Sequence, residues 1–349
     1  FDGSDGGRLR SYDRTAYEGA VRVRQARRED IAFVDAPLPV DTAAFDTIDL
    51  DDLVAFFARP AKVFATRCLG VRLDDGNDEI DEDRWEPDAL EKARLSKIIV
   101  ERTLDGWPEA AIFECVRSSG ALSLREAGAY EFADHLRDRV RPIVDIVSRE
   151  RGENRLPPLD VSLELGAHHL VGTLHGLSTT AQIATVGGKR SARHDLALWI
   201  RHLTLLSVDR PGFPTRSLVV GADDGKASVA SFGPILDART HLDDLVRLFV
   251  LGHTSPLPFF PNTSIAYAEG RMDSASTEGD ALRAAWRAWR STAFTTGDDA
   301  DSYVRLVFRG FDPTAANDAL PSAPRDHGFR SLAIRVFAPL LGNRREGST

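Results

Sequence analysis

Cysteine is scarce in this sequence, which has only two, Cys68 and Cys115, among 349 residues. Two cysteines are too few for a disulfide framework, a four-cysteine zinc site or a four-cysteine iron–sulfur cluster. Both are therefore expected to be buried thiols. No metal and no other cofactor is expected.

Long apolar runs are also missing. No stretch approaches the roughly 18 uninterrupted apolar residues of a membrane span, and the opening FDGSDGGRLR has no apolar signal region. We therefore expect a cytoplasmic protein with no membrane partner. The chain begins with Phe1 rather than methionine and its opening has the composition of a loop, so a fragment of a longer chain is expected.

The signatures of nucleotide-dependent enzymes are absent as well. A phosphate-binding loop needs a glycine at Ile183, ahead of VGGKRS (186–191), and GADDGKA (221–227) is one residue too short. The sequence also has no GxSxG, no HExxH and no GxGxxG that opens a helix. ATP binding, hydrolase chemistry and dehydrogenase chemistry therefore get little support.

Basic residues are outnumbered by acidic ones, which gives a net charge of -9. This balance argues against a surface that binds nucleic acid generally, although a local basic patch remains compatible with it. The stretch DDGNDEIDEDRWEPD (74–88) carries nine carboxylates, which repel one another and predict a solvated loop. The alternative, a metal site, lacks the glycine and the terminal glutamate of an EF-hand.

The chain is expected to have three parts. Residues 1–46 are rich in charged and turn residues and are predicted to be a connecting segment. Residues 47–155 show helical periodicity and predict a helical lobe. Residues 156–349 predict an α/β core followed by carboxy-terminal helices.

A proline lies inside an apolar helical stripe at the start of the helical lobe. The residues that share one helix face are Leu53, Phe56, Phe57, Pro60 and Phe64. Because proline breaks a helix interior but suits a first turn, the stripe predicts two short helices with a bend near Arg59. Gly70 fits a left-handed cap at the end.

Other elements follow from periodicity. Helices are predicted at 89–106, 129–151, 194–208, 241–254 and 279–294. Strands are predicted at 161–165, 168–177 and 181–186, with a hairpin at 217–232 around the turn DDG.

The order of strands, Lys and helix across 163–203 resembles the core of the PD-(D/E)xK nucleases. In that family an acid on each of two core strands and a Lys two residues after the second acid bind Mg²⁺ and activate water. The matching positions here are His175, Gly187 and Lys189, and no Asp or Glu occurs from Leu165 to His194. The resemblance therefore implies a degenerate nuclease site with no catalytic residues and no metal.

Four stretches together resemble the carboxy-terminal part of the RecC family, the gamma chain of exodeoxyribonuclease V. They are DLVAFFARPAKVFATRCLGVRL (52–73), LALWIRHLTLLS (196–207), PLPFFPNTSIAYAEG (256–270) and SYVRLVFRG (302–310). The resemblance covers about 48–341. It implies a nuclease-like fold without catalytic acids, RecB-like and RecD-like partner subunits, and a part in splitting duplex DNA.

The basic turn after the third predicted strand is the candidate for DNA contact. Lys189, Arg190 and Arg193 have no neighbouring acid before Asp195, so they suit phosphate contacts, although a solvated basic turn is the simpler alternative. The histidines of this region are His168, His169, His175 and His194. They lack Cys or carboxylate partners, and ordinary strand and turn roles are favoured over zinc.

Two tryptophans on a predicted helix have two interpretations. Trp286 and Trp289 are three residues apart on one helix face. This spacing suits the stacking of bases, but packing in the core is favoured.

The sequence predicts a non-catalytic DNA-handling and subunit-docking domain of a RecBCD-type helicase and nuclease, which acts in double-strand break repair and recombination. Its expected partners are RecB-like and RecD-like subunits and duplex and single-stranded DNA. One alternative is an active Mg²⁺-dependent nuclease that uses acids such as Glu164 and Asp195. The other is a protein-interaction domain without DNA contact.

Overall fold

The computed structural model shows a mixed α/β fold with two small sheets among many helices. It describes residues 14–15, 17–18, 21, 33–34, 36–39, 42–73, 89–123, 125–152, 154–292, 295–315 and 325–348. The acidic stretch 74–88 and most of the connecting segment 1–46 lie outside the described residues. Within the described part, no helix combines the length and the apolar character that a membrane crossing requires.

The residues that the structure describes up to position 151 are mainly helical. The elements there are η1(Thr42–Phe45), β1(Thr47–Asp49), α2(Leu50–Ala58), α3(Pro60–Val63), η2(Phe64–Cys68), α4(Ala89–Leu104), α5(Glu109–Ser118), α6(Glu126–His135), η3(Leu136–Val140) and α7(Arg141–Arg151). Strands and helices then follow as β2(Leu159–Leu165), β3(His168–Leu174), β4(Gln182–Val186), α8(Ala192–Val208), β5(Ser217–Asp223), β6(Lys226–Phe232), α9(Ala238–Thr254), α10(Pro261–Met272), α11(Glu278–Trp289), η4(Asp298–Ala300), α12(Ser302–Val307), η5(Arg325–His327), α13(Phe329–Asn343) and β7(Arg345–Ser348).

The strands form two sheets. The first has the order β1-β3-β2, with β2 and β3 antiparallel and β1 parallel to β3. The second has the order β4-β5-β6-β7, in which only β4 and β5 are parallel. Leu177 pairs with Gln182 between the end of β3 and the start of β4. The crossover from β4 to β5 runs through α8.

The bent helix pair predicted around Pro60 is confirmed. Helix α2 ends at Ala58, Arg59 leaves the helical conformation with φ -150°, and Pro60 opens α3. Gly70 has φ +66°, as a left-handed cap requires. The ring of Phe56 lies so close to Gly252 of α9 that a Cβ there would be 2.1 Å from the ring. The stripe therefore packs α2 directly against α9.

The other predicted helices and strands are also found, with shifted ends. The predicted helix 129–151 is found as α6, the π-helical η3 and α7, and the π-helical turns end at Val140, two residues before Pro142. The turn of the β5–β6 hairpin is Asp224–Gly225, both with positive φ. The sequence does not predict β1 or β7, because strands of three or four residues are too short to show an alternation.

Cys68 and Cys115 are free thiols, but both are partly exposed rather than fully buried. Desolvation raises the pKa of Cys68 to about 11. The Cys68 thiol is therefore protonated at neutral pH and a poor nucleophile.

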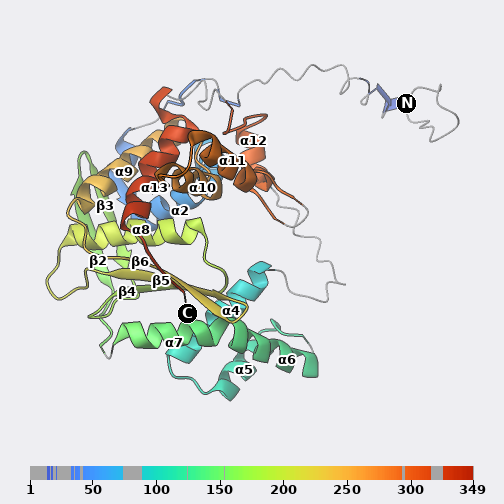
Figure 1. The fold of residues 1–349 in the computed structure, drawn as a ribbon, viewed down its shortest axis with the longest axis vertical. Coiled ribbons are helices and arrows are strands. Elements are labelled where there is room, and N and C mark those ends of the chain that lie inside the picture. The colour runs from blue at the N-terminus through green and yellow to red at the C-terminus, as the bar shows by residue number, and fades with distance from the viewer. Residues whose placement is uncertain are drawn as a thin grey trace.

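Three apolar cores hold the layers together. In Figure 1, α8 lies between the strands and the helices α2, α9, α10 and α13, while α4 to α7 cover the other side of the second sheet. The first core lies between α8 and the helices α2, α9 and α13 and includes Phe56, Trp199 and Phe337. The second core joins Ile143 of α7 to Val220 of β5. The third core surrounds Phe260 among α10 to α13.

His202 is a buried polar residue on the face of α8 that packs against the second sheet. The Nε2 atom of His202 is 2.8 Å from the Gly233 carbonyl oxygen, and its Nδ1 atom is 2.9 Å from the Ser217 hydroxyl. The Ser217 oxygen is also 3.1 Å from Gln182 Oε1, so its one hydroxyl proton is donated either to Nδ1 of the neutral imidazole or to this amide oxygen. Burial lowers the pKa of His202 to about 4. This network ties α8 to β4 and β5 while the imidazole is neutral.

We expect the chain to lose stability as the pH falls. The reason is that His202 binds a proton more readily in the unfolded state than in the folded one. The pKa rises from about 4 in the fold to the ordinary 6.5 on unfolding. The stability is therefore complete above pH 6.5 and falls progressively toward pH 4, by up to about 3 kcal/mol. Denaturant unfolding of the chain at several pH values measures this loss.

His202→Gln is expected to be less stable at pH 7 but to lose less further stability on acidification. The exposed His175→Gln variant is the control and should keep the slope of the parent chain. Equal slopes in the parent chain and His202→Gln would contradict this account.

Candidate nucleic-acid interface

The predicted basic turn connects the end of β4 to the start of α8. Ser191 is the N-cap of α8, and its backbone N–H donates to Nδ1 of His194 at 3.1 Å. Burial lowers the pKa of His194, so the ring is a neutral acceptor in this cap. His194 thus fixes the geometry of the turn that presents Lys189, Arg190 and Arg193.

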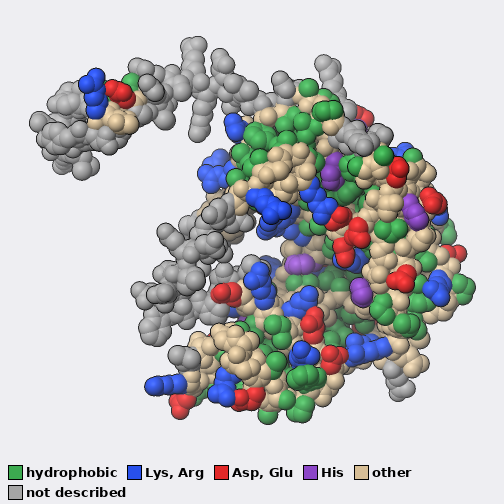
Figure 2. Space-filling model, turned by 180° about the vertical axis from the view of Figure 1, so that it is seen from behind, with side chains coloured by type: hydrophobic (Ala, Val, Ile, Leu, Met, Phe, Trp, Pro, Cys, Tyr) green, Lys and Arg blue, Asp and Glu red, His purple; other side chains and the backbone are tan. Residues whose placement is uncertain are grey.

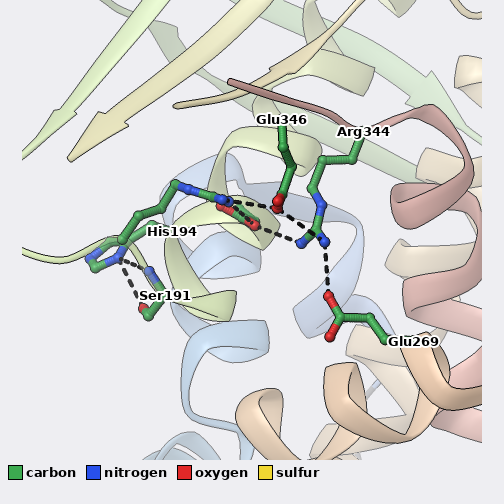
Figure 3. A network of polar contacts seen from close by, with 7 residues as sticks. Ser191, His194, Glu269, Arg344 and Glu346 are labelled. Atoms are coloured by element: carbon green, nitrogen blue, oxygen red, sulfur yellow. Dashed lines mark hydrogen bonds and ion pairs between the residues drawn. The ribbon is translucent and has the colours of Figure 1, made fainter. Parts of the chain in front are cut away.

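Arg190 belongs to a network of ion pairs around the buried carboxylate of Asp195. It contacts Asp195 directly, and its Nη2 atom lies 3.0 Å from Glu346 Oε1. Arg344 contacts Asp195 at 3.1 Å and Glu269 at 2.8 Å. Figure 3 shows Arg344 between Glu346 and Glu269, with Ser191 and His194 at the opposite end of the network. The network links α8, α10 and β7.

Arg193 faces a second buried acid. Asp298 accepts hydrogen bonds of 2.9 Å from both the backbone N–H and the hydroxyl of Thr263, at the start of α10. Arg193 Nη2 lies 3.8 Å from Asp298 Oδ1. Burial raises the pKa of Asp298 and lowers that of Arg193, because it disfavours both charged forms. Arg193 is therefore partly engaged in holding α8 against η4 and α10.

Lys189 differs from the other two cations. Its side chain is exposed, and no described carboxylate lies within ion-pair distance of its ammonium group. It is the member of the predicted set whose charge is directed to solvent and not to a buried acid.

The positions matched to nuclease acids are filled in two different ways. His175 is exposed just after β3. Gly187 is buried after β4, where an ideal Cβ would lie 1.9 Å from the Ala93 carbonyl oxygen and 2.9 Å from the Lys97 nitrogen, both in the backbone of α4. A carboxylate at 187 is therefore excluded unless α4 moves away.

The alternative acids are engaged elsewhere. Glu164 is exposed on β2, and its Oε1 atom is 3.7 Å from His169 Nδ1, while Asp195 is held by two arginines. In the part of the chain that is described, no group of three or more His, Cys, Asp or Glu is arranged to hold a metal. His168 contacts the Phe45 carbonyl oxygen at 2.8 Å, which is an ordinary structural role.

Sequence reasoning missed two cations near Arg193. Arg59 and Lys62, from the junction of α2 and α3, line one pocket together with Arg193 and Asp298. Figure 2 shows a face of the molecule on which Lys and Arg side chains border a hollow. The predicted break at Pro60 could have indicated that Arg59 leaves the helix, because the break ends α2 at Ala58.

Gly187→Ala is expected to lower the free energy of unfolding by about 1–3 kcal/mol or more, since the new methyl group meets the backbone of α4. The matched control is Gly188→Ala, whose Cβ would make only ordinary contacts at 3.5 Å or more. Denaturant unfolding of both variants makes the comparison. Equal stability of the two variants would contradict the close approach of α4 to Gly187.

Comparison with known protein families matches the part of the chain that contains the basic turn. The model of the RecC C-terminal domain family matches residues 45–272. The RecBCD enzyme subunit RecC of Mycobacterium tuberculosis, in strains H37Rv and CDC 1551, is 28% identical over 349 residues, which covers 95% of this chain and 30% of the relative. The same subunit of Mycolicibacterium smegmatis is 28% identical over 268 residues, 75% of this chain and 24% of the relative.

The chain thus spans less than a third of the length of these relatives. The family model covers more than half of the chain and includes β1 to β6, the basic turn and Asp195, whereas Arg344 and Glu346 lie beyond the matched residues. The chain belongs to the RecC C-terminal domain family.

Proposed function

We propose that this chain is a non-catalytic, DNA-handling and subunit-docking part of a RecBCD-type helicase and nuclease in the bacterial cytoplasm. The relatives are named as RecC subunits of the RecBCD enzyme, which supports RecB-like and RecD-like subunits as partners. In this proposal ATP hydrolysis and DNA cleavage belong to those partners. The chain contributes strand separation in double-strand break repair and recombination.

A nuclease-like core is part of the proposal. The succession β2, β3, β4, α8 and β5, with β4 parallel to β5 across a helical crossover, supports it. At the end of β4, Gly187 packs against α4 where that family places an acid. We propose that the core retains the architecture of a nuclease and has lost the means to hold Mg²⁺.

The observation that carries the proposed DNA contact is that Lys189 is exposed and lies within a stretch of the sequence, Leu165 to His194, that has no Asp or Glu. Arg190 and Arg193 remain proposed contacts, but each is also tied to a buried carboxylate. Replacing all three would therefore disturb the fold together with any DNA contact. Substituting Lys189 by itself separates the two effects.

Lys189→Ala is expected to weaken duplex DNA binding similarly for all sequences. The slope of log affinity against log salt should flatten by up to about 0.9 for one lost phosphate contact. Fluorescence anisotropy of labelled duplexes at several salt concentrations measures both quantities.

Arg210→Ala is the matched control, because Arg210 is an exposed cation in the turn at the opposite end of α8. This variant should bind duplex DNA as the parent chain does. Unchanged affinity and slope for Lys189→Ala would reject DNA contact at this turn and favour the protein-interaction alternative.

A further inference from the structure

The two tryptophans of α11 have different environments. Trp289 is buried, with its ring centroid 4.6 Å from that of Phe260. Trp286 is 46% exposed, although it lies only one turn earlier on the helix. Packing in the core, favoured by the sequence for both, therefore accounts for Trp289 and leaves the indole of Trp286 at the surface.

Trp286 forms one side of a shallow groove on the outer face of α11. The groove is lined by Leu282, Arg283, Trp286, Arg287 and Thr314. The guanidinium of Arg290 is 5.4 Å from the centroid of the Trp286 ring. An apolar wall and three cations thus meet within three turns of one helix.

The charge of this groove is positive. Arg283 is paired with Asp280 of the same helix. Arg287 and Arg290 are exposed, and neither has a described carboxylate within ion-pair distance. Among the described residues, these two cationic side chains flank the exposed indole and have no fixed counter-charge. A partner that supplies both negative charge and a flat apolar surface complements them.

Single-stranded DNA has both properties. Its bases stack on aromatic side chains, and its phosphates pair with nearby arginines. We infer that the α11 groove binds single-stranded DNA by stacking a base on Trp286, while Arg287 and Arg290 contact the adjacent phosphates.

This inference extends the proposed DNA-handling role but uses different residues. α11 packs against η4, which carries Asp298, the partner of Arg193. Helices α11 and α8 thus both contact this short element. Duplex binding through Lys189 and single-strand binding through Trp286 can fail independently in experiments.

The test uses the full chain and two labelled oligodeoxynucleotides of about 20 nucleotides, longer than the roughly 4–16 nucleotides of a typical single-strand site. One is oligothymidine, and the other has the same backbone with abasic positions. Trp286→Ala should weaken oligothymidine binding about tenfold and leave abasic binding unchanged. Trp286→Phe keeps an aromatic face and should retain most of the affinity.

Trp107→Ala is the matched control. Trp107 is 41% exposed and has the guanidinium of Arg102 at 4.4 Å from its ring centroid, but it lies after α4 in the other helical layer. This variant should bind both oligonucleotides as the parent chain does. The double variant Arg287→Gln, Arg290→Gln should weaken binding to both oligonucleotides and flatten the salt dependence.

Three results would overturn the inference. The first is parental binding of oligothymidine by Trp286→Ala. The second is an equal loss of binding to the thymidine and abasic strands in that variant, which would show that no base stacks there. The third is a loss in Trp107→Ala as large as that in Trp286→Ala. If Lys189→Ala still weakens duplex binding in any of these cases, the proposed function survives without this groove.

Discussion

The buried carboxylate of Asp195 is the charge around which the end of β4, the start of α8 and β7 are arranged. It lies in the first turn of α8, where the helix dipole favours an anion, and two guanidinium groups complete its neutralisation. Removing one member of such a buried pair typically costs about 3–5 kcal/mol, since the remaining charge stays uncompensated. Arg344 extends the network to Glu269 of α10, so one acid fixes the positions of three elements at once.

This constraint explains why some side chains of the basic turn hold the fold together while Lys189 stays exposed. Arg190 and Arg193 point toward buried acids, and Gly187 packs on the backbone of α4. The space around Gly187, where the proposed nuclease-like core would place a second acid, is therefore filled by the backbone of α4. Lys189 remains exposed at the same turn. In the proposed function, a rigid turn of this kind holds a cation against the DNA backbone without the chemistry to cut it.

Local sequence patterns predict much of this fold, whereas the contacts that define the site are long-range. Pro60 and Gly70 place the bend and the end of the first helix pair, and alternation finds the strands, because these signals act within a few residues. Arg190 and Glu346 are 156 positions apart, so no local pattern reveals their pairing. The contact of Gly187 with Ala93 is equally hidden. Periodicity also cannot distinguish Trp286 from Trp289, since both follow the same helical spacing and only tertiary packing buries the second.

The most direct test of the central claim asks whether the chain binds DNA without cutting it. End-labelled linear duplex is incubated with the chain and Mg²⁺, and each sample is divided between a native and a denaturing gel. The account predicts a shifted band on the native gel and strands of unchanged length on the denaturing gel. Mg²⁺-dependent shortening of the strands that disappears in Glu164→Ala would contradict it and show that an active nuclease site exists in this chain.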